Sequence, residues 1–168
     1  KNSNNIAPLA VLTSVAIAYH EVIEEAMLPL LSVREFYDWD LSRALNENST
    51  LSVKDYDIPF AQKERWESNQ LQHRKKYPHG LRDFIVDYQF NVRKLNQQIH
   101  KVFDKLHTKS NNGDFIGKKL LNEIDIRKWE VRADDENPGR FVVQPNYEEE
   151  VVKYLDSNKD YIEAQNIS

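Results

Sequence analysis

One run of apolar residues constrains the fold of this 168-residue chain more than any other feature. Between residues 81 and 106 the apolar positions follow one another in steps of four and three: Leu81, Ile85, Tyr88, Val92, Leu95, Ile99, Val102 and Leu106. An α-helix of this length carries one continuous apolar stripe along a single face, here called the 81–106 seam. Such a stripe must be buried against other helices, so the seam predicts a helical core.

A second helical region is predicted over residues 8–45. Pro8 suits the first turn of a helix, and apolar residues recur at helical spacing from Leu9 onwards. Pro29 removes a backbone hydrogen bond, so we expect the helix to break or kink near Leu28. With only 4 Gly and 6 Pro in the chain, we expect a mainly α fold. The predicted architecture is an antiparallel helical bundle with long helices near 8–45 and 81–107.

Smaller elements are predicted around these two regions. A thin apolar face predicts a helix over residues 60–76, and a turn at residues 77–80 ends it. After the seam, Asp114 can cap a short helix, and Asn146 is expected to cap a final one. Between them, apolar and polar residues alternate on either side of an acidic loop, which predicts one β-hairpin at about 128–144.

We expect this hairpin to cover one end of the helical core. We interpret residues 1–168 as a single helical domain. Residues 110–168 form a smaller helix–hairpin–helix subregion within it, without a firm boundary.

Composition and charge limit the functions open to the chain. The absence of Cys excludes disulfides, thiolate metal sites and a cysteine nucleophile. Residues 63–109 carry a net charge of +6 between two flanks of −5 each. A basic centre of this kind either binds anions or pairs with the acidic flanks, and the sequence pI of about 5.8 favours pairing. The longest charge-free apolar stretch, residues 6–19, is shorter than the ~20 residues of a membrane-spanning helix.

A histidine–carboxylate pair is the first candidate for chemistry. His20 and Glu24 lie one helical turn apart, with Glu21 and Glu25 beside them, so the pair could ligate a divalent metal ion. The chain has no second matching pair, and a solvated acidic face accounts for the same residues. We therefore expect neither a metal nor a cofactor.

Arg93 and His100 form the second candidate, seven residues apart on the predicted seam helix. The pair resembles the catalytic motif of the HEPN ribonuclease family, in which Arg and His at a helical dimer interface cleave RNA without metal. Arg can hold a phosphate while His transfers a proton. The resemblance covers eight residues, and it implies a metal-independent ribonuclease with Arg93 and His100 as catalytic residues. A row of solvated or acid-paired bases is the other interpretation.

The predicted short helix followed by a hairpin looks like a winged helix, with Lys118 and Lys119 on the helix. The predicted hairpin tip, however, carries Asp134, Asp135 and Glu136, which DNA phosphates would repel. This charge pattern disfavours DNA as a partner.

The sequence contains no phosphate loop, dinucleotide fingerprint, zinc-hydrolase motif or nucleophile elbow. We therefore interpret the chain as a non-enzymatic sensing, adaptor or scaffolding module that acts through protein or small-ligand contacts. A protein partner or a second copy of the chain is the expected partner.

The alternative is an RNA-binding protein or HEPN-like ribonuclease using the basic 74–107 region. The candidate ligand- or partner-binding residues are Arg74, Lys75, Lys76, Arg93, Lys94, His100 and Lys101. The sequence does not indicate a compartment, and we interpret the chain as a soluble region of a longer, bacterial-type protein.

Overall fold

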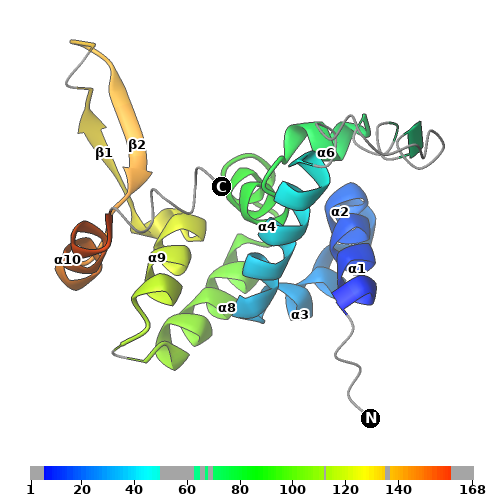
Figure 1. Cartoon of the computed structure of the whole chain (residues 1–168), viewed down its shortest axis with the longest axis horizontal. Coiled ribbons are helices and arrows are strands. Elements are labelled where there is room, and N and C mark those ends of the chain that lie inside the picture. Colours follow the sequence, from blue (N-terminus) through cyan, green and yellow to red (C-terminus); the bar gives the residue numbers. More distant parts are fainter. Residues whose placement is uncertain are drawn as a thin grey trace. The chain divides into compact units, whose positions relative to one another are not determined.

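The computed structural model describes residues 6–49, 63, 64, 67, 70–111, 113–134 and 137–159. Its helices are α1 (Ile6–Ala18), α2 (His20–Ile23), α3 (Leu28–Leu31), α4 (Arg34–Ser49), α6 (Gln72–Lys76), α7 (Leu81–Asp87), α8 (Asn96–Lys109), α9 (Phe115–Ile124) and α10 (Glu149–Ser157). Shorter turns are the 3-10 helices η1 (Glu24–Met27) and η3 (Ile126–Lys128) and the π-helix η2 (Tyr88–Val92). The strands are β1 (Trp129–Ala133) and β2 (Phe141–Pro145). The predicted fold class, mainly helical with one hairpin and a final helix, is confirmed (Figure 1).

The chain divides into two compact units, residues 1–102 (unit 1) and residues 103–168 (unit 2), and their boundary lies within α8. Each unit has its own buried side chains. Unit 1 buries Met27, Leu31, Tyr37, Leu81, Phe84, Ile85, Tyr88, Leu95 and Ile99, and unit 2 buries Phe103, Leu106, Leu120, Leu121, Ile124 and Val151. The single domain with a subregion from residue 110 stays a prediction.

In unit 1, α1, α4 and α7 pack against one another. A buried carboxylate ties α4 to the start of α7, because Asp40 Oδ2 accepts a hydrogen bond from the Leu81 N–H at 2.7 Å. Asp40 Oδ1 accepts a second one from Arg43 Nε at 2.9 Å. Gly80 has φ +65, and a Cβ at this position would lie 2.1 Å from Asp40 Oδ2. Only glycine allows this close approach, so the predicted turn before Leu81 is fixed by packing as well as by its sequence.

The 81–107 region is not one uninterrupted helix, which corrects the prediction of a single seam helix. After α7 the backbone widens into the π-helix η2, and Arg93 then adopts a left-handed conformation with φ 63 before α8 begins. A π-helix has more residues per turn than an α-helix, so the stripe rotates out of phase. Val92 is consequently exposed, while Leu81, Ile85, Tyr88, Leu95, Ile99 and Leu106 are buried as expected, together with Phe103, which lies outside the seam.

The 8–45 region is divided as well. Pro29 lies in the first turn of α3, where proline is tolerated, so the break expected near Leu28 is present. An additional break occurs at Glu24, whose φ is 43. Leu12 and Tyr19, which share the predicted apolar spacing, are exposed. Within the predicted 60–76 helix, residues 60–62, 65, 66, 68 and 69 lie outside the described residues. Residues 63, 64 and 67 are helical, and the end of the predicted helix is present as α6.

Unit 2 contains the predicted capped helix and hairpin. Asp114 caps α9, because its Oδ1 accepts a hydrogen bond from the Gly117 N–H at 3.0 Å. Strands β1 and β2 are antiparallel, with Trp129 opposite Pro145 and Ala133 opposite Phe141. The prediction that Asn146 caps the last helix is wrong, since α10 begins at Glu149. The Asn146 N–H instead donates to the Lys128 carbonyl at 2.9 Å and closes the base of the hairpin.

Candidate functional site

The basic residues predicted to bind a ligand or partner are spread over three places in the chain. Three lie on α6 or at its end, two lie at the break before α8, and two lie on α8: Arg74, Lys75, Lys76, Arg93, Lys94, His100 and Lys101. Because the backbone is left-handed at Arg93, this residue and His100 do not share one continuous helix. The single helix predicted to carry Arg93 and His100 is therefore interrupted. A binding role for these seven residues stays a prediction.

Lys76 and Lys94, two of these bases, form ion pairs within unit 1. Lys76 Nζ lies 2.8 Å from Asp87 Oδ2, and Lys94 pairs with the Glu24 carboxylate. Both hydrogen-bonded contacts raise the pKa of the lysine concerned. Arg82 pairs with Asp38 in the same way. Lys94 and Arg82 thus connect the basic centre of the chain with its acidic N-terminal flank, which is the pairing that the low pI favours.

His20 and Glu24, the predicted histidine–carboxylate pair, each contact other residues. The Nδ1 atom of His20 lies 3.0 Å from the carbonyl oxygen of Ile17, and its ring packs in a T-shaped arrangement with the rings of Phe84 and Tyr88. Glu24 is paired with Lys94. Within the described residues, no three His, Asp or Glu side chains are grouped so that they could hold a metal ion.

One face of the hairpin is entirely apolar. Side chains alternate between the two faces of a strand, so Trp129, Val131 and Ala133 of β1 share a face with their cross-strand partners. Those partners are Pro145, Val143 and Phe141, so all six side chains on this face, the hairpin face, are apolar. The opposite face carries Glu130, Arg132, Val142 and Gln144.

The distal half of the hairpin face is exposed. The exposed fractions are 65% for Val131, 72% for Phe141 and 48% for Val143, whereas Trp129 and Pro145 at the base are half-buried. Figure 1 shows the hairpin extending away from α9 and α10. Within the described residues of unit 2, no helix covers this half of the hairpin face, and the expectation that the hairpin covers one end of the helical core stays a prediction. The alternation in the sequence was the available signal for an apolar face, but it does not say whether that face is covered.

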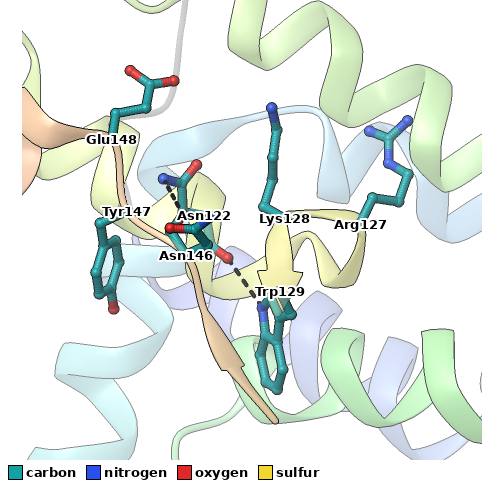
Figure 2. Close-up of a pocket in the computed structure, with 7 residues that line it drawn as sticks. All are labelled: Asn122, Arg127, Lys128, Trp129, Asn146, Tyr147 and Glu148. Atoms are coloured by element: carbon teal, nitrogen blue, oxygen red, sulfur yellow. Dashed lines mark hydrogen bonds between the residues drawn. The ribbon is translucent and has the colours of Figure 1, made fainter. Parts of the chain in front are cut away.

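A pocket of about 250 Å³ lies at the base of the hairpin in unit 2 (Figure 2). Hydrogen bonds hold its walls, because Trp129 Nε1 donates to the Asn122 carbonyl at 3.1 Å and Asn122 Nδ2 donates to the Asn146 carbonyl at 3.2 Å. Tyr147 donates to Glu123 Oε1 at 3.0 Å. Burial raises the pKa of Tyr147 well above its usual range, and the Glu123 carboxylate raises it further. The residues lining the pocket are Asn122, Arg127, Lys128, Trp129, Asn146, Tyr147 and Glu148.

Arg127, on one wall of this pocket, is held by carboxylates. Its Nε and Nη2 atoms donate to the two oxygens of buried Asp125 at 2.9 and 2.7 Å, and Nη2 also reaches Asp104 Oδ1 at 2.8 Å. His107 Nε2 lies 3.4 Å from Asp125 Oδ2. Burial alone would raise the pKa of Asp125, but its contacts with His107 and Arg127 outweigh burial and hold that pKa well below its usual range. The charge of Arg127 is thus compensated within the fold.

The other two charged residues of the pocket, Lys128 and Glu148, have opposite signs. The lining is therefore close to neutral, and the amides of Asn122 and Asn146 supply hydrogen-bonding groups without favouring an anion or a cation. Its volume also lies below the roughly 300–1,000 Å³ of sites for drug-sized ligands. The pocket could hold a small polar molecule, but its chemistry does not select one class.

The chain matches no known family, no curated protein and no solved structure. None of the helices that the structure describes combines the length and the apolar character needed to cross a membrane.

Proposed function

We propose that this chain is a non-enzymatic adaptor or scaffolding module whose hairpin face docks a protein partner. The observation that carries the proposal is the exposed distal half of that face, formed by Val131, Ala133, Phe141 and Val143. An isolated two-stranded hairpin is at best marginally stable in water, so packing against a partner would stabilise it. Contiguous exposed apolar side chains with polar surroundings are typical of interaction surfaces.

The charges around the hairpin indicate the chemistry of the partner. Asp134 follows β1, and the sequence continues with Asp135 and Glu136, so the connection between the strands is acidic. A partner segment with apolar side chains and flanking Lys or Arg residues would complement both the face and this connection. Such charge complementarity contributes mainly to specificity and to the rate of association.

A displayed library of random peptides, presented to the full chain, tests this proposal. We expect recovered peptides to share an apolar core with basic flanks, and Phe141→Ser or Val131→Ser to weaken their binding at least tenfold. Val22→Ser is the matched control, because Val22 is 80% exposed but lies on α2 in unit 1. Recovered peptides whose binding is unchanged by both hairpin substitutions would contradict the proposal.

RNA is the alternative partner, and one observation favours it. Four of the five residues of α6 are His73, Arg74, Lys75 and Lys76, and both Lys75 and Lys76 are exposed. Binding of a single-stranded RNA would weaken steeply with added salt, because Lys and Arg displace counterions from phosphates. Tight, salt-sensitive binding that Lys75→Ala and Lys101→Ala reduce would favour RNA over a protein partner. RNA cleavage lost in Arg93→Ala and His100→Ala, with folding intact, would favour the ribonuclease.

A further inference from the structure

Two residues of unit 1 other than glycine have positive φ angles, Glu24 with 43 and Arg93 with 63. This backbone region is unfavourable for residues with a Cβ, and such positions persist only where surrounding contacts impose them. The two positions are far apart in the sequence, yet side chains connect them. Lys94, next to Arg93, pairs with the Glu24 carboxylate, and Gln98 Nε2 donates to Glu25 Oε1 at 3.2 Å.

The sequence around Arg93 contains nothing that would end a helix. Residues 81–109 include neither Gly nor Pro, and the 81–106 seam passes through the break without a missed step. The break instead depends on specific contacts. The Arg93 N–H donates to the Tyr88 carbonyl at 3.0 Å, Arg93 Nε donates to the Phe90 carbonyl at 2.6 Å, and Asn96 Nδ2 donates to the Gln89 carbonyl at 2.9 Å. Local preference and the observed backbone therefore disagree at residues 88–95.

The break leaves the Val92 side chain partly exposed to solvent. It belongs to the seam but is 40% exposed, because the π-helix turns it away from the side that buries Tyr88 and Leu95. If residues 88–95 formed an ordinary α-helix, Val92 would rejoin the seam, and α7 and α8 would become one helix. The contacts that oppose this change include an ion pair between exposed side chains, which contributes little to stability.

We infer that this segment is a hinge with two states. In the bent state, which is the structure described here, the pairs Glu24–Lys94 and Glu25–Gln98 hold the left-handed turn at Arg93. In the straight state these pairs are released and residues 81–109 form one α-helix. A partner that binds one state better than the other would shift the balance between them, so the hinge would give a module of this kind a means of regulation.

Spin labels on either side of the hinge test this inference in the full chain. The chain has no Cys, so Val86→Cys and Lys101→Cys introduce labels without background reaction. Fifteen residues of unbroken α-helix separate these Cα atoms by about 22 Å. Pulsed electron resonance should show a main maximum for the bent state and a minor one near that value.

Substitutions at the hinge should change the two populations in opposite directions. Arg93→Gly removes the backbone penalty and should abolish the minor maximum. Lys94→Glu places like charges together and should raise that maximum at least threefold, while Glu24→Lys in the same chain should restore the bent state. Lys105→Glu on α8 is the control, and it should leave the populations of the bent and straight states unchanged. Arg93→Val keeps the ion pair but disfavours the left-handed turn, so it should also raise the minor maximum. One unchanged maximum in both Lys94→Glu and Arg93→Val would overturn the inference.

Discussion

Gly80 has φ 65 and ψ −126 and lies against the carboxylate of Asp40. Residues with a Cβ rarely adopt this backbone conformation, and the added methyl group would displace the acceptor of the Leu81 N–H. We therefore predict that Gly80→Ala lowers the free energy of unfolding by at least about 2 kcal/mol, from backbone strain and a disrupted buried hydrogen bond. Urea denaturation followed by circular dichroism measures this change.

Gly113→Ala is the matched control for this substitution. A Cβ at Gly113 would meet no heavy atom within 4 Å, and its φ lies outside the positive range that favours glycine. We expect its effect to stay within about 0.5 kcal/mol, as for most surface substitutions. Equal losses for both glycines would show that the contact between Gly80 and Asp40 contributes little.

Asp125 makes the stability of the fold depend on pH. Its carboxylate is buried, and the His107 and Arg127 contacts hold its pKa below the ~3.9 of an unfolded aspartate. Because the folded pKa is the lower one, the unfolded chain takes up the proton first as the pH falls. The stabilisation is therefore complete above the unfolded pKa and is lost as the pH decreases towards the folded one.

We accordingly predict that Asp125→Asn costs about 2 kcal/mol at pH 7, since Arg127 loses its main partner. The same substitution should flatten the decrease in unfolding free energy between pH 4 and pH 2. Denaturant unfolding at several pH values provides both measurements. Asp156→Asn on the exposed face of α10 is the control, and an equally flattened profile in that variant would contradict the assignment to Asp125.

At the scale of elements, the sequence predicted those features that depend on neighbouring residues alone, namely the two strands and one helix cap. The alternation of apolar and polar residues predicted β1 and β2. Pro138 and Gly139 favour a turn between the strands, and Gly139 has a φ of 90. Asp114 was recognisable as a cap because an aspartate stands directly before an apolar helical run. Asn146 has similar chemistry, but its backbone N–H closes the base of the hairpin, a contact that no local pattern predicts.

The seam shows where prediction from local sequence ends. Its spacing correctly placed most of the buried residues between 81 and 106, yet it also implied one straight helix. Directly after the turn at Arg93, Lys94 and Gln98 contact Glu24 and Glu25, which lie about seventy residues earlier in the chain. Contacts between such distant segments are not visible in a local pattern, and tertiary context often overrides helix propensity. The charge pattern likewise led us to predict the basic residues as a binding site. It could not show that Lys76 and Lys94 are paired with carboxylates elsewhere in the chain.

At the scale of the whole molecule, each unit exposes an apolar surface. Unit 2 exposes the distal hairpin face, and unit 1 exposes a set of side chains on α1, α2 and the residue between them: Val11, Leu12, Val15, Tyr19 and Val22. Surfaces of this kind favour association, and a second copy of the chain is the partner always present in a purified sample. A stable interface usually buries about 800 Å² on each partner, which the four distal hairpin side chains do not approach.

We therefore predict weak self-association that depends on concentration. In sedimentation experiments the apparent mass should rise above 19.8 kDa only at high protein concentration. The variant Val131→Ser/Phe141→Ser should remove this rise if the hairpin face is the contact, whereas Val15→Ser/Val22→Ser should remove it if the unit 1 surface is. A chain that stays monomeric at every concentration would exclude a second copy as the occupant of either surface.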